Sequence, residues 1–318
     1  MQEFTVPDAM LLVLSGLVVA TNVAVCWLVI ARRVLRTYTN GFVVSLAVSD
    51  ILSGGIFMPV AVLRPLSTFR GHVAMMVIVS STLNLSAVAF DRYLAVVRPL
   101  AYKSRIETSF IRIVVAVWGA SGLMSVLPVF WKADETLLVH KVYLSCAVIL
   151  FLVLPLVFIL FVYTFIFVKL RQHGKLLRNL HATRTRIDEA RRSRRESKSV
   201  KMFFIILAVF ATCWIPVIYM TFAAYVANRL DIIPASLTII SHYCIMLSSL
   251  INPFLYTFMK LDFQREVRAM LPCKRFKERA RPGRGRYNGE SMRTTKATFL
   301  SVIDAESKSL SCNSNSNY

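Results

Sequence analysis

Seven long apolar runs, separated by polar connections, constrain this chain more than any other feature. They lie near residues 9–31, 41–63, 72–90, 113–131, 142–168, 202–228 and 232–259. A helix needs about 20 residues to cross a bilayer, and each run is close to that length or longer. Hydrophobic residues make up 56% of the 318 residues, and the mean hydropathy is +0.58. The sequence therefore predicts an all-α membrane protein, a seven-transmembrane helix bundle.

The basic residues are distributed unevenly between the connections. Of the 38 Lys and Arg residues, 33 lie in 32–40, 91–112, 169–201 and the tail from 260, and five lie in the other connections. Since Lys and Arg favour the cytoplasmic side, we expect a multi-pass plasma-membrane protein with its N-terminus outside and its C-terminus inside. The net charge of +21 is explained mostly by this cytoplasmic preference, together with attraction of the basic residues to anionic lipids. Nucleic-acid binding is therefore not expected.

The expected organisation has four parts. A short extracellular N-terminus (1–8) precedes the seven-transmembrane bundle (9–259), and a short amphipathic helix on the membrane surface (260–273) precedes a disordered cytoplasmic tail (274–318). In the surface helix, Phe263 and Val267 share an apolar face opposite Arg265. Cys273 at its end is either a palmitoylation site or a plain free thiol.

The third run ends abruptly in Asp91-Arg92-Tyr93. Arginine does not lose its proton in proteins, so near hydrocarbon Arg92 needs partners or water. Asp91 is one partner by adjacency, and Glu196, from another helix, is the candidate for a second. We interpret this cluster as a switch that holds one helix arrangement and is released in another.

Polar residues and prolines interrupt several runs. Asp50 lies near the middle of the second run, where an ionised carboxylate costs about 2.5–3.5 kcal/mol, so it needs a cation, water or polar side chains. Pro59 predicts a bend, and Pro155 permits a local bulge. Pro216 predicts a kink, and the pair Asn252-Pro253 breaks the hydrogen-bond ladder where polar partners must repair it.

These motifs, each in its own run and in this order, resemble those of the rhodopsin-family (class A) G-protein-coupled receptors. The resemblance covers roughly residues 10–273. Within the family, the chain as a whole is most similar in character to the amine receptors. It is carried by Asn22, Leu46-Ala47-Val48-Ser49-Asp50, Asp91-Arg92-Tyr93, Trp118, Pro155 with Tyr163, Cys213-Trp214-Ile215-Pro216 and Asn252-Pro253-Phe254-Leu255-Tyr256.

The resemblance implies an activation switch. Arg92 would pair with Asp91 and, in the resting state, with Glu196, which lies eighteen residues, or five helical turns, before Trp214. On activation the sixth helix would swing outward, and Tyr163 and Tyr256 would turn inward. The switch residues are Asp91, Arg92, Tyr93, Tyr163, Glu196, Trp214, Pro216, Asn252, Pro253 and Tyr256.

The resemblance also implies an internal sodium site, since hard cations prefer oxygen ligands. Its residues are Asp50, Ser81, Ser249 and Asn252. Sodium bound there would act as an allosteric ion that favours the resting state, and no cofactor is required.

Within the family, this chain departs from the usual pattern at its outer end. Ser67 stands where the family's disulfide cysteine is expected, and the loop 132–141 has no cysteine. Ala74 stands where amine receptors carry the acid that binds an ammonium group. The seventh run also has no lysine before Lys260 for a retinal Schiff base.

The expected ligand pocket is mostly apolar, so its ligand is predicted to be a small, largely apolar or neutral molecule. His242 either hydrogen-bonds that ligand or has a structural role within the bundle. The pocket residues are Ala74, Ile78, Ala147, Phe151, Trp214, Val217, Ile218, Thr221, His242 and Met246.

The resemblance implies a receptor that passes an extracellular small-molecule signal to heterotrimeric G proteins. Its further expected partners are arrestin, receptor kinases and membrane lipids. No catalytic triad, zinc spacing or phosphate loop is found, so an enzyme is not expected. Two alternatives stay open: a constitutively active or scaffolding member without an agonist, and a seven-helix transporter or channel with Asp50 and His242 on an ion path.

Overall fold

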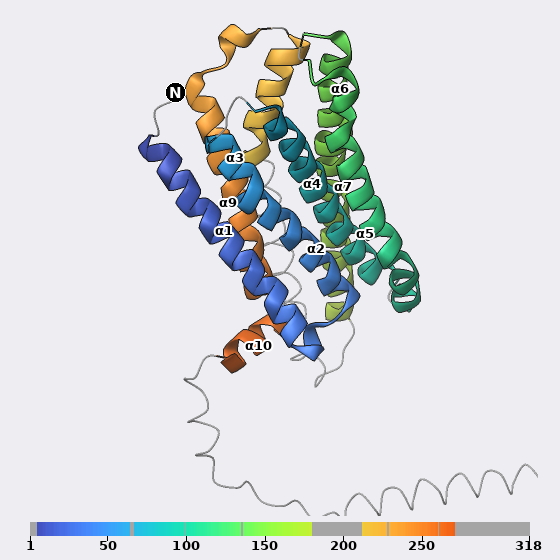
Figure 1. The fold of residues 1–318 in the computed structure, drawn as a ribbon. Helices are drawn as coiled ribbons and strands as arrows, with labels where there is room; N and C mark the ends of the chain where they lie inside the picture. Colours follow the sequence, from blue (N-terminus) through green and yellow to red (C-terminus); the bar gives the residue numbers. More distant parts are fainter. Residues whose placement is uncertain are drawn as a thin grey trace, which may run out of the picture. The chain divides into compact units, whose positions relative to one another are not determined.

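The computed structural model describes residues 5–63, 67–98, 100–134, 136–179, 212–227, 229–259 and 261–270. Every regular element in these ranges is a helix (Figure 1). Six helical segments are long and apolar enough to cross a membrane, and the shorter apolar helix Thr212–Val226 is the described part of the predicted sixth run. The predicted all-α bundle is confirmed for these residues.

The helices follow the predicted runs closely. The first four spans are α1 (Val6–Ala31), followed by η1 (Arg33–Leu35); α2 (Tyr38–Leu52) with η2 (Ser53–Phe57) and α3 (Met58–Leu63); α4 (Thr68–Val97); and α5 (Tyr102–Val126) with η3 (Leu127–Trp131). The rest are α6 (Leu138–Val148) with η4 (Ile149–Val153) and α7 (Leu154–Asn179); Thr212–Val226, which ends in η5 (Phe222–Val226); η6 (Leu230–Ile232); α9 (Ala235–Met259); and α10 (Leu261–Met270).

Two prolines are each preceded by a π-helical segment. A proline ring clashes with the carbonyl four residues earlier, and a wider turn relieves that clash. The residues four before Pro59 and Pro155 are Gly55 and Phe151, and they lie inside η2 and η4 respectively. The bulge predicted at Pro155 is confirmed. By contrast, α9 continues as one helix through Pro253.

Helix α4 lies at the centre of the bundle, packed against α2, α5 and α7, while α1 packs against α2 and α9 (Figure 1). The largest buried cluster includes Leu46 of α2, Leu85 of α4, Ile159 of α7 and Met246 of α9. Trp214 belongs to the same cluster and is 2% exposed. We call the end of the bundle where α1, α4 and α9 begin the outer end, and the opposite end the inner end, after the predicted orientation.

Large apolar side chains also cover the outside of the bundle. Because a soluble protein seldom exposes such a surface, these residues indicate contact with lipid and support a multi-pass membrane protein. Examples from four spans are Val13, Trp27, Val115, Leu123, Phe161 and Ile240.

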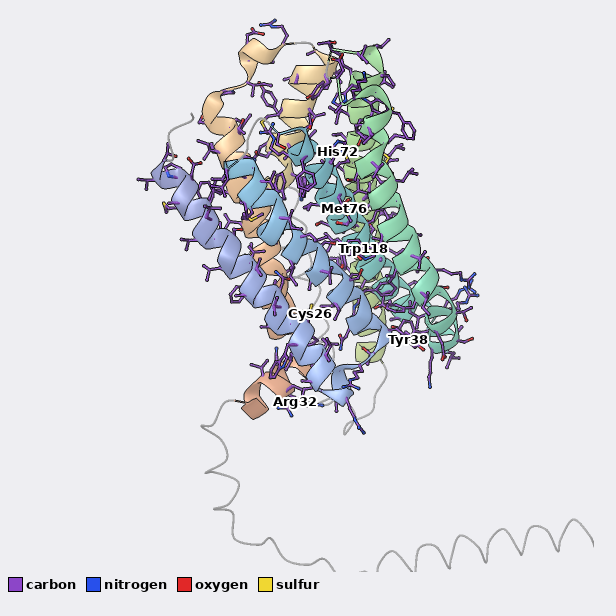
Figure 2. All side chains as sticks on the ribbon, viewed as in Figure 1. Cys26, Arg32, Tyr38, His72, Met76 and Trp118 are labelled. Carbon is purple, nitrogen blue, oxygen red and sulfur yellow. The ribbon has the colours of Figure 1, made fainter. Side chains whose placement is uncertain are left out.

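The predicted amphipathic helix is present as α10, and part of its apolar face packs on protein. Phe263 is fully buried in a cluster with Leu28, Leu35 and Val43, and Val267 packs against the same cluster. Arg32 follows the last residue of α1, near α10 (Figure 2). Its guanidinium lies 3.4 Å from the Glu266 carboxylate. These contacts fix α10 against the inner end of α1 and α2.

Helix α1 approaches η2 closely at Gly54. A Cβ at Gly54 would lie 2.9 Å from the Ser15 carbonyl oxygen and 3.1 Å from Val19 Cγ2. The Ser15 hydroxyl donates a hydrogen bond to the Gly54 carbonyl, which holds the two backbones together. At the neighbouring Gly55, the nearest atom to a Cβ would be Val19 Cγ2 at 3.7 Å, which is ordinary contact.

We therefore predict that Gly54→Ala destabilises the protein by about 1–3 kcal/mol, because the added methyl overpacks the contact between α1 and η2. The matched control Gly55→Ala should be neutral or stabilising by up to about 1 kcal/mol, since alanine restricts the unfolded chain. Thermal unfolding of the purified variants in detergent checks both. Equal unfolding midpoints for the two variants would show that the close approach of α1 to Gly54 does not exclude a larger side chain.

Candidate functional site

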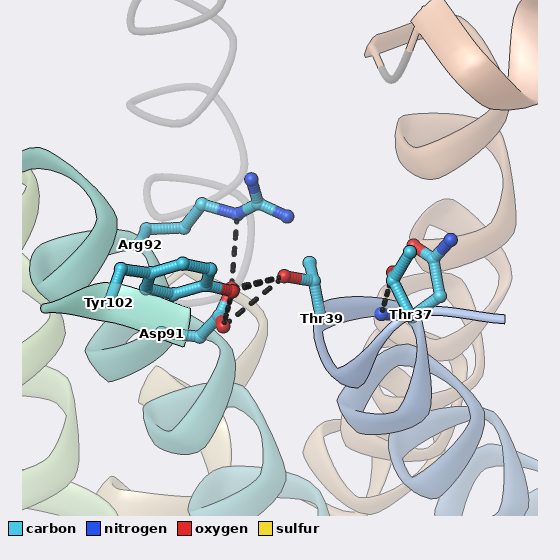
Figure 3. Close-up of polar contacts among 6 residues, drawn as sticks. Thr37, Thr39, Asp91, Arg92 and Tyr102 are labelled. Carbon is cyan, nitrogen blue, oxygen red and sulfur yellow. Dashed lines mark hydrogen bonds and ion pairs between the residues drawn. The ribbon is translucent and has the colours of Figure 1, made fainter. Parts of the chain in front are cut away.

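The inner end holds a compact cluster around the buried Asp91 carboxylate (Figure 3). The Thr39 hydroxyl lies 3.0 Å from Asp91 Oδ2 and the Tyr102 hydroxyl donates to Asp91 Oδ1 at 2.7 Å. The two hydroxyl oxygens are themselves 2.8 Å apart. Arg92 Nε lies 3.7 Å from Asp91 Oδ2. Asp91 therefore joins three helices, α2, α4 and α5.

Two helix starts bring these hydroxyls to Asp91. Thr39 is in the first turn of α2, where the Thr37 side chain caps the helix by accepting from the Asn40 amide (Figure 3). Tyr102 is the first residue of α5. Helix N-termini also favour a nearby negative charge. Sequence reasoning missed Thr39 and Tyr102, because nothing in their spacing shows that both helix starts meet α4.

Arg92 keeps an unused donor in this arrangement. Its Nη2 is buried and has no hydrogen-bond partner among the described residues. The ring of the next residue, Tyr93, packs against Phe165 of α7, with ring centroids 5.5 Å apart. Glu196, predicted to be the second partner of Arg92, lies outside the described residues.

The remaining switch residues lie on the helices that surround this cluster. Tyr163 of α7 is 3% exposed and belongs to the same buried cluster as Leu85 and Ile159. Pro216 lies in the helix that carries Trp214, and its predicted kink stays a prediction, since this helix is described only from Thr212. Tyr256 belongs to α9, but its side chain lies outside the described part.

A second polar cluster lies deep in the bundle, around Asp50, which is 1% exposed. The Asn252 amide donates to Asp50 Oδ2 at 2.9 Å, and Ser249 lines the same cavity as Asp50. A cavity of about 10 Å³ adjoins them, which is room for about one water-sized particle. It is lined by Leu46, Asp50, Ser53, Val77, Ser81, Leu85, Trp214, Ile245, Ser248, Ser249 and Asn252.

All four residues of the predicted sodium site therefore line one cavity. Sequence reasoning missed two further serines there. Ser248 donates its hydroxyl to the Ile245 carbonyl at 2.8 Å. The Ser53 hydroxyl is buried and has no hydrogen-bond partner in the described part of the chain, because η2 turns it into the bundle.

The residues predicted to line the ligand pocket fall into two packed groups. Ala74, Ile78, Val217 and Ile218 are partly buried and pack on the cluster that contains Trp214 and Met246, whereas Ala147 and Phe151 belong to a cluster between α4 and α6. Thr221 donates its hydroxyl to the Val217 carbonyl at 2.9 Å, within its own helix. The His242 ring meets the Phe57 ring edge-on, with centroids 5.9 Å apart.

Hydrogen bonds join the helices at the outer end. His72 Nδ1 lies 2.5 Å from the Ser125 carbonyl oxygen, and the Ser125 hydroxyl donates back to the His72 carbonyl at 2.8 Å. Trp131 donates to His140 Nδ1 at 2.9 Å. The four cysteines among the described residues, at positions 26, 146, 213 and 244, are free thiols.

A bundle of apolar helices with an Asp-Arg pair at its inner end and a buried carboxylate beside an Asn-Pro pair defines a seven-helix membrane receptor. The chain matches the family model "7 transmembrane receptor (rhodopsin family)" over residues 21–256. It therefore belongs to the rhodopsin family of seven-transmembrane receptors.

Individual relatives are distant. The chain is 26% identical to melanopsin of Podarcis siculus over 313 residues, which covers 87% of this chain and 65% of that protein. It is 28% identical to the histamine H2 receptor of Homo sapiens over 292 residues (83% and 79%) and 27% identical to adenosine receptor A2b of Gallus gallus over 307 residues (83% and 88%). The chain spans less than two thirds of the melanopsins, 65% and 57% of their lengths.

The Asp91 cluster gives a stability prediction. Tyr102→Phe should destabilise the folded protein by about 1.5–3 kcal/mol, because it removes a hydrogen bond to a buried carboxylate. The matched control is Tyr93→Phe, since the Tyr93 hydroxyl has no hydrogen-bond partner among the described residues, and its effect should be small. Thermal unfolding of both variants in detergent measures the difference. A Tyr102→Phe variant as stable as Tyr93→Phe would contradict the assigned role.

Proposed function

We propose that this protein is a G-protein-coupled receptor. It takes an extracellular small-molecule signal and passes it to heterotrimeric G proteins by outward movement of the sixth helix. The observation that carries this proposal is the Arg92 side chain, which is held by the buried Asp91 and retains a buried, unused donor. Membership of the rhodopsin receptor family supports it.

In the proposed resting state, Glu196 accepts a hydrogen bond from the Arg92 guanidinium and holds the sixth helix at the inner end. Activation breaks this contact and leaves Arg92 available to the G protein. Asp91 keeps its bonds to Thr39 and Tyr102, so the arginine moves while the carboxylate stays in place. Inward rotation of Tyr163 and Tyr256 then stabilises the open form.

Trp214 is the proposed link between the outer and inner ends. It lines the Asp50 cavity, and it lies two residues before Pro216 in the helix that is proposed to move. An agonist that shifts Trp214 from the outer side would reshape this cavity. A hinge at Pro216 would convert that shift into movement at the inner end.

We also propose that the Asp50 cavity binds sodium. The cavity lining suits a sodium ion, because it combines one carboxylate with serine and asparagine oxygens and contains no Lys or Arg. The buried Ser53 hydroxyl without a partner is a further oxygen ligand for such an ion. Sodium would supply the positive charge that Asp50 needs in the membrane, and would stabilise the resting form by mass action.

The remaining expectations belong to the same proposal. The N-terminus lies outside the cell and the C-terminus inside, and arrestin and receptor kinases act on the activated form. Palmitoylation of Cys273 and disorder of 274–318 concern residues outside the described ranges. No observation on the described residues favours a transporter, a scaffold or an enzyme.

The switch proposal predicts that Glu196→Ala raises basal G-protein output by up to roughly 10-fold, the factor that about 1.4 kcal/mol corresponds to. The variant removes one restraint on the resting form. Glu189→Ala is the matched control, because it removes an acid from the same connection one heptad earlier. Second-messenger reporters in cells, at equal surface expression, measure the output. Unchanged output in Glu196→Ala would exclude this restraint.

The sodium proposal predicts that sodium chloride raises the unfolding midpoint of the purified protein above that in choline chloride at equal ionic strength. Asp50→Asn should abolish this difference, because it removes the charge that attracts the ion. Ser249→Ala should reduce it, whereas Ser248→Ala should preserve it, since the Ser248 hydroxyl is bonded within its own helix. Persistence of the sodium effect in Asp50→Asn would place the ion elsewhere.

A further inference from the structure

The connection from η3 to α6 turns back sharply at the outer end of the bundle. Lys132 and Ala133, which follow η3, have φ angles of 54° and 52°, a left-handed backbone that is unfavourable for residues with a Cβ. The amides of Asp134, Leu137 and His140 each donate to the carbonyl three residues earlier. This chain of turns returns the backbone, so the first turn of α6 lies beside the last residue of η3.

One side-chain hydrogen bond closes this loop. Trp131 Nε1 donates to His140 Nδ1 at 2.9 Å. The indole nitrogen of tryptophan can only donate, so Nδ1 of His140 carries no proton and the ring is neutral. His140 is 7% exposed, and its ring contacts those of Trp131, Tyr143 and Tyr225, with centroids 6.2, 6.0 and 6.2 Å away.

His140 therefore connects three elements. Trp131 ends η3, His140 lies in the first turn of α6, and Tyr225 lies in η5, at the outer end of the helix that is proposed to move. The elements α6 and η5 pack directly on each other. Ala147, a residue of the predicted ligand pocket, follows His140 by seven positions and so shares its face of α6.

A proton on Nδ1 of His140 is incompatible with this arrangement. Two N–H groups would then point at each other, and the bond to Trp131 would be lost. The new charge would be buried among aromatic rings, which disfavours it. It would also lie in the first turn of α6, where the helix dipole disfavours a cation.

The charged groups around His140 leave this conclusion in place. The elements η3 and η5 contain no charged residue, and Lys132 and Lys141 oppose a further positive charge. Asp134 is exposed, and its carboxylate accepts from the Thr136 amide at 2.9 Å and from the Thr136 hydroxyl at 2.7 Å. The two tyrosines that contact the ring stay neutral near pH 7, since phenols ordinarily titrate at about pH 10.

His72, at the same end, has the opposite hydrogen-bond polarity. Its Nδ1 lies 2.5 Å from the Ser125 carbonyl oxygen, which can only accept, so this nitrogen already carries a proton. A second proton would bind to the other ring nitrogen and leave the bond to Ser125 in place, with a charged donor that strengthens it. His72 is therefore an internal comparison for His140.

We propose that the bond between Trp131 and His140 is a proton-operated latch. With His140 neutral, the latch holds η3 and the connection 132–137 against the first turn of α6. When the outer medium becomes acidic, His140 takes up a proton at Nδ1, the bond to Trp131 opens, and the ring leaves its contact with Tyr225. Outer protons thereby loosen the packing of the sixth helix on α6. The latch itself does not depend on the proposed receptor function.

The first test measures the unfolding midpoint of the purified full-length protein in detergent between about pH 7.5 and 5.5, around the ordinary titration of histidine. Protonation removes the bond from the folded form only, so stability falls as the pH falls. The midpoint of the parent should fall by about 2–4 °C more than that of His140→Asn, whose amide oxygen accepts from Trp131 but does not titrate. An equal fall in both proteins would overturn the latch.

Two further variants serve as controls for this test. His72→Asn should lose at least as much stability in acid as the parent, because the latch remains. Trp131→Phe removes the donor and should lower the midpoint already at about pH 7.5 and reduce the further fall in acid. An undiminished fall in Trp131→Phe would assign the effect to another group and overturn the latch, also where His140→Asn does not fold.

The second test follows hydrogen–deuterium exchange in peptides that cover 132–137 and 222–226. At each pH the rate in the parent is divided by the rate in His140→Asn, which cancels the intrinsic acid dependence of exchange. This ratio should rise by about 5- to 10-fold from pH 7.5 to 5.5 in both peptides, the factor that losing one hydrogen bond allows. An unchanged ratio in both would overturn the latch, and a rise in 132–137 alone would overturn its coupling to the sixth helix.

The latch and the receptor function fail separately. Both tests use purified protein without a G protein, so a negative result leaves the proposed receptor function untouched. A latch that opens in acid, in a protein without G-protein output in cells, would support the latch and contradict the receptor function alone.

Discussion

A carboxylate inside an apolar bundle must find donors within the protein, and this requirement shapes both polar clusters. Asp91 takes its donors from the starts of α2 and α5, and Asp50 takes one from Asn252 of α9. Helix α2 takes part in both clusters, since it carries Thr39 and Asp50. Because each carboxylate is bonded to other helices, these helices cannot shift independently of one another without exposing a buried charge.

The outer end is held by another type of contact. Helix α4 begins at the N-cap Ser67, and reciprocal hydrogen bonds of His72 and Ser125 join α4 to α5 at this end. The bond from Trp131 to His140 continues this joint to α6. Hydrogen bonds break and re-form far more readily than a covalent bridge, so these contacts can open locally.

The sequence alone predicted the features that depend on local pattern. Run length predicted the spans, and the position of Pro155 predicted a bulge, because both follow from neighbouring residues. The family resemblance implied a shared site for Asp50, Ser81, Ser249 and Asn252, and all four line one cavity. The missed residues depend on tertiary contacts: Tyr102 and Thr39 reach Asp91 only because two helix starts converge, and no periodicity encodes that. The start of α4 was placed four residues late, so Arg70 was assigned to a connection and not to the helix.

Helix α4 connects the two polar sites. Ser81 and Asp91 lie on this one helix ten residues apart, or about 15 Å. Because α4 packs on α2, α5 and α7, it is suited to be a fixed frame for both sites. In the proposed mechanism the moving element is the helix with Trp214 and Pro216, and Trp214 lines the Asp50 cavity. A ligand at the outer end would then act on the inner end by changing how this helix packs against α4.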